Sequence, residues 1–372
     1  MLRFITMRRR FSMATEKPRR VFGPGQESRR NLIKTALAGA AMSATALPGL
    51  AQAAETGQFP FVDHPKWRFV FVNHVTTNPF FVPTQYGIED ACRLLGCTYQ
   101  WTGSQNSIAT EMVNSMNAAI ASHADAIAVC LVDPHAFNDP TDRALQAGIP
   151  VFSYNADVSG NHRLAYIGQD LYNAGMALGE HIVSLVESGD VAGFIATPGQ
   201  LNIQPRLDGA RDAIKKSGKK ITLHEVSSGA KVNEEFSAVE AFYLGHPNLK
   251  GMFAVDAGST EAVGATMRKH GLAKKGVKAG GFDMLPGTLK EIHEGNLDFT
   301  IDQQPYLQGF YTVLEMFLYM MSGGLTGPSD INTGLKFVTA SSVGPYLNTT
   351  SRFEGNAKDQ KLIARKGPIG AV

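Results

Sequence analysis

The chain alternates between short apolar runs and segments with helical periodicity, and no other feature constrains its fold as strongly. Residues 126–132 and 149–154 are almost uninterrupted apolar runs, which is typical of strands buried on both faces of a parallel sheet. Before the first of these runs, Ile108, Met112 and Met116 recur four residues apart. This spacing indicates the apolar face of a helix. Strands that alternate with helices in this way predict a doubly wound α/β fold.

The alternation continues along most of the chain, and the chain length predicts two sheets. A single hydrophobic core rarely grows beyond about 250–300 residues, whereas this chain has 372. Strands are expected at 68–74, 98–101, 126–132, 149–154, 164–167, 191–196, 221–226, 251–255, 277–282, 299–301 and 335–339. Helices are expected at 81–95, 108–120, 172–187, 205–217, 234–245, 258–269, 286–294 and 305–321. We therefore expect two lobes, each with its own parallel sheet.

Composition excludes several other classes of protein. A hydrophobic fraction of 44% and a net charge of +2 exclude disorder for the bulk of the chain. Its 38 glycines and 18 prolines are scattered without period, which excludes a collagen-like repeat. Three cysteines cannot build a disulfide scaffold. Cys92, Cys97 and Cys130 are expected to be small buried hydrophobes, and a Cys92–Cys97 bridge stays open as an alternative.

The first 53 residues differ from the rest and resemble an export signal. Arg29 and Arg30 precede the uncharged, alanine-rich run 35–50, and a small-x-small cleavage site follows at 51–53. Paired arginines before a mildly hydrophobic run are typical of twin-arginine signals, which export folded proteins. The alternative is a membrane anchor, but sixteen mild residues are too short to span a bilayer. We expect a periplasmic protein with a loose tail at 348–372.

The charge of the remaining chain argues against nucleic acid as a partner. Residues 1–53 contain ten Lys and Arg and two acids, and removing them from the totals leaves 25 basic against 31 acidic residues. Binding to phosphates needs a basic surface, which an acidic body does not provide. No nucleic-acid partner is therefore expected.

Polar residues gather where the predicted strands end, which is where open parallel sheets bind ligands. Carboxylates and amides bind hydroxyl groups, an arginine adds fixed donors, and aromatic faces cover C–H-rich surfaces. The inventory therefore suits a small polyhydroxylated molecule such as a sugar. The candidate ligand-binding residues are His74, Asn78, Phe80, Phe81, Asp133, Asn155, Arg206, Asp256, Asp283 and Gln303.

Short motifs at these positions resemble the ribose-binding-protein group of periplasmic solute-binding proteins, over roughly residues 68–340. The motifs are Asn78-Pro79-Phe80-Phe81, Ser104-Gln105-Asn106, Val132-Asp133-Pro134, Ala147-Gly148-Ile149-Pro150-Val151, Gly281-Phe282-Asp283 and Thr300-Ile301-Asp302-Gln303. The resemblance implies a type I fold, with two lobes joined by a three-strand hinge that close on a sugar and deliver it to an ABC transporter permease. It implies an N-terminal lobe of 66–164 plus 304–330 and a C-terminal lobe of 165–303 plus 331–347. By position, the ten candidate residues match pocket residues of such proteins.

Two departures from the family pattern argue against ribose itself. Ribose-type members carry an Asp-Arg pair after the fourth strand, where this chain has Asn155-Ala156. Losing both removes fixed donors and a strong acceptor for neighbouring hydroxyls. His74 stands where a small hydroxyl residue is usual. We therefore expect another monosaccharide or a polyol.

Several candidate residues also have plain structural interpretations. Phe80 or Phe81 could belong to the core, and Asp133 and Asp283 could cap helices. His74 could be a satisfied buried histidine. Arg206 is different, because a helix start disfavours a cation; we expect it in the pocket near Asp256 and Asp283.

An enzyme is the rival functional class. The sequence has no Gly-x-Ser-x-Gly, Walker or His-Glu-x-x-His motif, and its histidines lack metal-ligand spacing. Pocket carboxylates could act as acid and base, but no nucleophile accompanies them. A binder that serves a sensor instead of a transporter also stays open. We expect a monomer that uses no cofactor and no metal.

Overall fold

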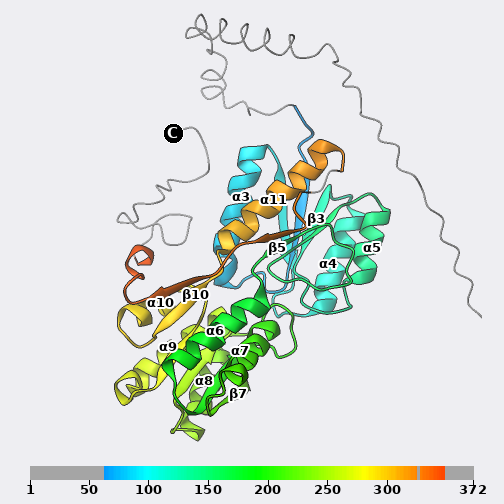
Figure 1. Ribbon diagram of the computed structural model, residues 1–372. Helices are drawn as coiled ribbons and strands as arrows, with labels where there is room; N and C mark the ends of the chain where they lie inside the picture. The colour runs from blue at the N-terminus through cyan, green and yellow to red at the C-terminus, as the bar shows by residue number, and fades with distance from the viewer. Residues whose placement is uncertain (1–62, 325–326, 348–372) are drawn as a thin grey trace, which may run out of the picture. The chain divides into compact units, whose positions relative to one another are not determined.

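The computed structural model describes residues 63–324 and 327–347 (Figure 1). The predicted signal at 1–53 and the predicted tail at 348–372 lie outside these residues. Within the described ranges, no helix is both long enough and apolar enough to serve as a membrane span.

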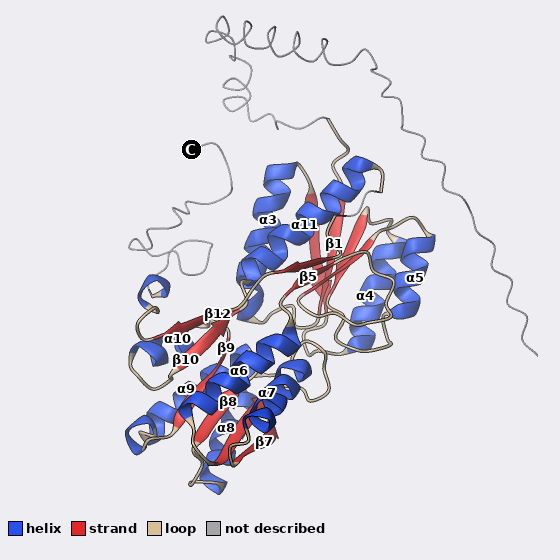
Figure 2. Cartoon of the chain, viewed as in Figure 1, coloured by secondary structure: helices blue, strands red, loops and turns tan. Residues whose placement is uncertain are grey.

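The first sheet has six parallel strands in the order β11-β5-β4-β3-β1-β2. Its strands are β1 (Arg68–Asn73), β2 (Thr98–Gly103), β3 (Ala126–Val129), β4 (Val151–Tyr154), β5 (Tyr166–Gly168) and β11 (Asp330–Asn332). Its helices are η1 (Pro79–Phe81), α3 (Val82–Leu95), α4 (Ala109–Ala121), α5 (Asn138–Gln146) and α11 (Pro305–Ser322). Figure 2 shows α3 and α11 on one face and α4 and α5 on the other. Every residue of β3 and β4 is buried, as the apolar runs predict.

The second sheet has the order β12-β10-β9-β8-β6-β7 and is parallel except for β12, which pairs antiparallel with β10. Its strands are β6 (Gly189–Ile195), β7 (Ile221–Ser227), β8 (Gly251–Ala254), β9 (Lys278–Phe282), β10 (Phe299–Asp302) and β12 (Lys336–Thr339). Its helices are α6 (Leu171–Leu185), α7 (Gln204–Ser217), α8 (Val232–Gly245), α9 (Ala257–His270), α10 (Pro286–His293), η2 (Ala273–Lys275) and η3 (Gly344–Tyr346). The predicted fold of two doubly wound parallel-sheet lobes is confirmed.

Two of the predicted lobe boundaries need correction. Both β5 and β11 pair within the first sheet, whereas the prediction assigned residues 165–168 and 331–332 to the C-terminal lobe. The chain therefore passes between the sheets after Gly168, after Asp302 and after Asn332. The reason is that a three-residue strand shows no periodicity that would reveal which sheet it joins. For the same reason β11 is absent from the prediction. The nine-residue helix α5 is absent from it as well.

The three cysteines are buried free thiols, as the composition predicts. Cys92 lies in the last turn of α3, and the alternative bridge to Cys97 is not formed. Burial, with the nearby charge of Asp125, raises the pKa of Cys97 to about 12. These thiols therefore act as apolar side chains of the first core.

Candidate binding site between the two sheets

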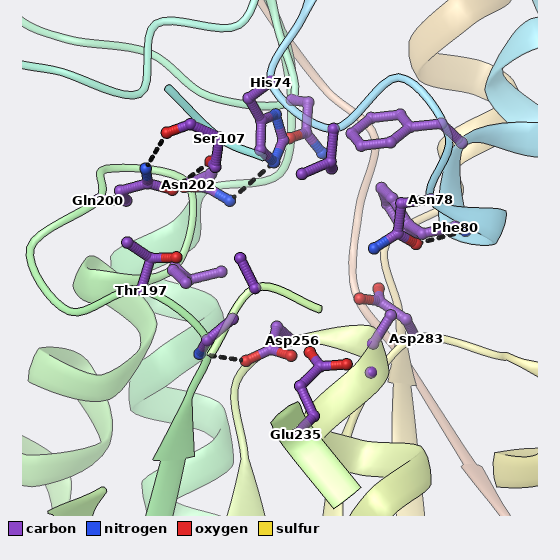
Figure 3. A pocket seen from close by; sticks show the side chains of 18 of the residues that line it. His74, Asn78, Phe80, Ser107, Thr197, Gln200, Asn202, Glu235, Asp256 and Asp283 are labelled. Carbon is purple, nitrogen blue, oxygen red and sulfur yellow. Dashed lines mark hydrogen bonds between the residues drawn. The ribbon is translucent and has the colours of Figure 1, made fainter. Parts of the chain in front are cut away.

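A pocket lies where loops that follow the strands of both sheets come together (Figure 3). This is the edge at which open parallel sheets bind ligands. Nine of the ten predicted residues line it: His74, Asn78, Phe80, Phe81, Asn155, Arg206, Asp256, Asp283 and Gln303. They come from both lobes, so the pocket is completed only by the two sheets together.

Asp133 is the predicted residue that the structure places outside the lining of this pocket. Its carboxylate accepts the backbone N–H groups of His135 and Ala136, at 2.9 and 2.8 Å. Both bonds fold the side chain back onto its own loop, as aspartates in turns commonly do. The family pattern places an aspartate here, but its local cap holds it away from the cavity.

The aromatic wall begins at the first turn after β1. The side chain of Asn78 accepts the N–H of Phe80 at 2.9 Å and so starts η1, which presents Phe80 and Phe81 to the pocket. The two rings pack edge to face with centroids 4.7 Å apart. Phe81 also packs on Trp101, whose indole N–H donates to the carbonyl of Thr76 and which does not line the pocket. The aromatic residues thus join the ligand wall to the core of the first lobe.

His74 is buried and neutral. Burial lowers the pKa of its ring to about 3. The amide nitrogen of Asn202 lies 3.1 Å from Nε2. Since an amide N–H can only donate, Nε2 accepts and the ring hydrogen sits on Nδ1. That Nδ1, like Oδ1 of Asn202, is buried and has no protein partner among the described residues, which leaves a donor and an acceptor for a ligand.

A chain of side-chain amides connects the two lobes behind the pocket. Asn155 donates to Gln308 at 3.2 Å, Gln308 donates to Gln303 at 3.1 Å, and Gln303 donates to Asp283 at 2.7 Å. Asn155 and Asp283 both have positive φ, 64° and 73°, a backbone conformation that Asn and Asp tolerate better than most residues. The order of donors makes the carboxylate of Asp283 the final acceptor of the chain.

Arg206 is buried in the pocket wall with only 2% of its surface exposed. It donates to the carbonyl of Val255 at 3.0 Å and to Oε1 of Gln169 at 3.2 Å, and its Cζ lies 4.2 Å from the ring centre of Phe282. Burial lowers its pKa, while Asp283, Tyr166 and Asp256 oppose that shift. Its guanidinium thus bonds to a carbonyl and an amide oxygen, with no carboxylate of the described residues at ion-pair distance, and its Nε has no hydrogen-bond partner there.

The two predicted aspartates occupy different environments. Asp256 is the N-cap of α9, and its carboxylate accepts the N–H groups of Ala196 and Ser259 and the hydroxyl of Ser259, each at 2.9 Å. Among the described residues, the carboxylate of Asp283 accepts one hydrogen bond, from Gln303. Burial raises the pKa of Asp283 to about 7, although Arg206 and the bond from Gln303 lower it. Both aspartates offer oxygen acceptors beside Arg206.

The structure adds pocket residues that were not predicted. Ser107 and Gln200 join the lobes, with Ser107 donating to Oε1 of Gln200 at 2.7 Å and the Gln200 amide donating to the carbonyl of Ser107 at 2.9 Å. Asn202 and Thr197 come from the same long loop between β6 and α7. Glu235 comes from the first turn of α8. A long polar loop after a strand signals Gln200 and Asn202 in the sequence, whereas Glu235 has no such signal.

Comparison with known proteins agrees with this geometry. A family model described as the periplasmic binding protein domain matches residues 69–324. The xylose/arabinose-binding protein XylF of Sulfolobus acidocaldarius is 52% identical over 320 residues, which is 82% of this chain and 78% of that protein. The ribose import binding protein RbsB of Escherichia coli is 24% identical over 235 residues, 61% of this chain and 76% of that protein.

Solved structures show the same fold. An ABC transporter solute-binding protein from Burkholderia graminis, in complex with D-arabinose, aligns with a TM-score of 0.71 at 28% identity and covers 77% of this chain and 99% of that chain. A carbohydrate transporter from Acidothermus cellulolyticus, in complex with myo-inositol, aligns with a TM-score of 0.66 at 25% identity and covers 75% and 96%.

Proposed function

The chain belongs to the periplasmic binding protein domain family, and we propose that it captures a pentose of the xylose or arabinose type and delivers it to an ABC importer. One observation carries the proposal: a buried pocket between two parallel sheets whose wall combines aromatic faces, one arginine and several unpaired hydrogen-bonding groups. Support for a pentose comes from the relative named for xylose and arabinose and from the D-arabinose complex.

The proposed binding residues divide by chemistry. Phe80 and Phe81 cover the apolar face of the ring, as aromatic side chains do in pockets of this kind. The free Nδ1–H of His74 and Nε–H of Arg206 donate to sugar oxygens, while carboxylates accept from hydroxyls. We assign to the site His74, Asn78, Phe80, Phe81, Asn155, Arg206, Asp256, Asp283 and Gln303.

Binding without turnover fits this set of residues. The matched family and the relatives above are binding proteins, and the lining includes no cysteine or lysine, and no serine paired with a histidine, that could act as a nucleophile. We propose that the protein is not an enzyme, acts as a monomer outside the cytoplasm, and binds no nucleic acid. Conversion of a bound pentose during incubation would contradict this proposal.

A thermal-shift and calorimetry screen tests the sugar class. We expect D-xylose, L-arabinose and D-arabinose to stabilise the mature protein more than ribose or myo-inositol. A ligand that binds only the folded state, at about a hundred times its Kd, adds roughly 2.7 kcal/mol to the free energy of unfolding. If none of the three pentoses shifts the melting temperature or releases heat, the proposed substrate class is wrong.

Export is expected to depend on the paired arginines of the predicted signal. Replacing Arg29 and Arg30 by lysine keeps the charge but removes the pair that twin-arginine export requires. The precursor should then stay in the cytoplasm, measured by fractionation and immunoblot in a host with that pathway. The matched control replaces Arg19 and Arg20, a second arginine pair farther from the apolar run. Normal export of the Arg29→Lys/Arg30→Lys protein would show that the pair is accidental.

A further inference from the structure

Glu235 and Asp256 form a pair of carboxyl groups on the pocket wall. Figure 3 shows the two side chains next to each other at the edge of the cavity. Glu235 comes from α8 and Asp256 from the start of α9, and both carboxyl groups line the pocket. Only 4% of Glu235 is exposed. A Cβ atom on Gly258 would lie 2.0 Å from Oε2 of Glu235, so this glycine leaves the space that the carboxyl group fills.

The hydrogen-bond donors around the pair show which carboxyl group carries the proton. Asp256 already accepts three bonds from Ala196 and Ser259, which stabilise its ionised form. No N–H or O–H donor to Glu235 is found among the described residues, and the group beside its carboxyl is Asp256. Two buried carboxylates in contact cannot both keep their charge without a cation. One of the two carboxyl groups therefore keeps a proton, and the donors around Asp256 assign that proton to Glu235, from which it can be donated to Asp256.

No cation among the described residues pairs with Glu235, and the charge of Arg206 acts on Asp256 instead. Glu234 on the same helix and Glu261 on α9 are acids that further disfavour the Glu235 carboxylate. Lys231 pairs with Glu234 instead, at 3.7 Å. Across the pocket, Asp283 adds another acid, and the guanidinium of Arg206 donates to Val255 and Gln169. Burial and the contact with Asp256 raise the pKa of Glu235 to about 9.

We propose that Glu235 binds the sugar as a neutral carboxylic acid, with its hydroxyl donating to Asp256 and its second oxygen accepting a hydroxyl hydrogen of the pentose. The proposal rests on the proposed function and adds a ligand contact that no motif at a strand end predicts. In this arrangement the hydroxyl of neutral Glu235 satisfies Asp256, and its carbonyl oxygen stays available as an acceptor for the sugar. Closing the pocket on a sugar removes water from the pair, so the bound state holds the shared proton more firmly than the free state. By linkage, affinity must fall when pH rises past the pKa of Glu235 in the free protein.

Replacing Glu235 by glutamine tests whether the side chain binds as a neutral acid or as a carboxylate. The amide of Glu235→Gln can donate to Asp256 and accept from the sugar, so we expect affinity for D-xylose and L-arabinose within about threefold of wild type at pH 7. Glu235→Ala removes the acceptor and should lose about tenfold. Glu234→Gln, on the exposed neighbour, is the matched control. Circular dichroism verifies the fold of each protein.

Calorimetry between pH 6 and pH 10 then measures how pentose affinity depends on the protonation of Glu235. The wild-type and Glu234→Gln proteins should lose up to tenfold in affinity per pH unit above about pH 9, while Glu235→Gln should lack this decrease. Asp283 titrates in the same range, but all the variants retain it, so the ratio of wild type to Glu235→Gln isolates Glu235. A tenfold loss for Glu235→Gln at pH 7, or the same decrease above pH 9 in both proteins, would overturn the neutral-acid assignment. Wild-type affinity in Glu235→Ala would remove Glu235 from the site.

A second measurement needs no sugar. The folded protein keeps the Glu235 proton between pH 4.5 and about 9, where the unfolded chain has lost it. The folded state thus binds more protons, and its stability relative to Glu235→Gln must fall as pH rises through that window. Denaturant titration gives the folding equilibrium constants of wild type and Glu235→Gln, and the ratio of wild type to variant should fall by up to tenfold per pH unit. A flat ratio refutes the raised pKa, whereas failure of all three pentoses to bind the wild-type protein refutes the proposed function and the sugar contact with it.

Discussion

Replacing Arg206 by alanine is expected to reduce pentose affinity by about ten- to a hundredfold while the ligand-free protein remains folded. A charge-assisted hydrogen bond in a buried site contributes about 1.5–3 kcal/mol. Arg206 has a free Nε–H beside the acceptors of the pocket, and Val255, Gln169 and Phe282 hold its guanidinium in place. The substitution removes a preorganised donor and the positive charge that lowers the pKa of Asp283.

The folded state should tolerate the loss of Arg206. Burial lowers its pKa, which means that the folded protein carries the charge at a cost. Removing the charge relieves this cost, although it leaves the side chain of Gln169 and the carbonyl of Val255 without a donor. We expect a melting temperature within a few degrees of wild type, measured by differential scanning calorimetry without sugar.

Two variants serve as controls for Arg206→Ala. Arg206→Lys keeps a cation but loses the planar group that bridges Val255 and Gln169, so it should also bind weakly. Arg211→Ala changes an exposed arginine of the same helix, which pairs with Asp208 and Glu225 on the surface, and should bind like wild type. Wild-type affinity in a folded Arg206→Ala protein would exclude Arg206 from the site.

The strand-end residues of the site could be predicted because topology determines where they lie. Asp256, Asp283 and Gln303 follow strands of one parallel sheet, and the carboxyl ends of such strands meet at one edge. Their neighbours in sequence, buried apolar runs, show where each strand stops. The same reasoning placed Asp133 in the pocket, and failed there because two backbone N–H groups of its own turn bind the carboxylate instead.

Glu235 could not be predicted because its position depends on a distant helix. It lies one turn into α8, where an acidic residue is expected on dipole grounds alone. It reaches the pocket because α9 begins beside it with Gly258, whose missing side chain leaves room for the carboxyl group. A contact of this kind depends on how two helices pack, and no local pattern in either helix encodes it.

The close packing of α6 on α7 leads to a prediction for Gly175. A Cβ atom at this position would lie 2.1 Å from the carbonyl oxygen of Arg206 and 2.6 Å from its Cα. Both are backbone atoms, so no side chain can rotate away to make room. Gly209 faces the same contact from α7, where a Cβ would lie 2.3 Å from the carbonyl oxygen of Tyr172. The backbone of Arg206 is thus held against α6 at a point where only glycine fits.

Gly175→Ala should therefore damage stability and binding together. Overpacking of this kind costs about 1–3 kcal/mol and sometimes more, which lowers the melting temperature by several degrees. Since the clash displaces the backbone of Arg206, we also expect weaker pentose binding, measured by calorimetry at a temperature where the variant is folded. Gly245→Ala is the control, because a Cβ at the exposed end of α8 meets no atom within 4 Å and an alanine there should stabilise the helix slightly. A Gly175→Ala protein with the melting temperature and pentose affinity of wild type would contradict this prediction. It would mean that α6 and α7 can move apart without displacing Arg206, so that α6 does not position the arginine.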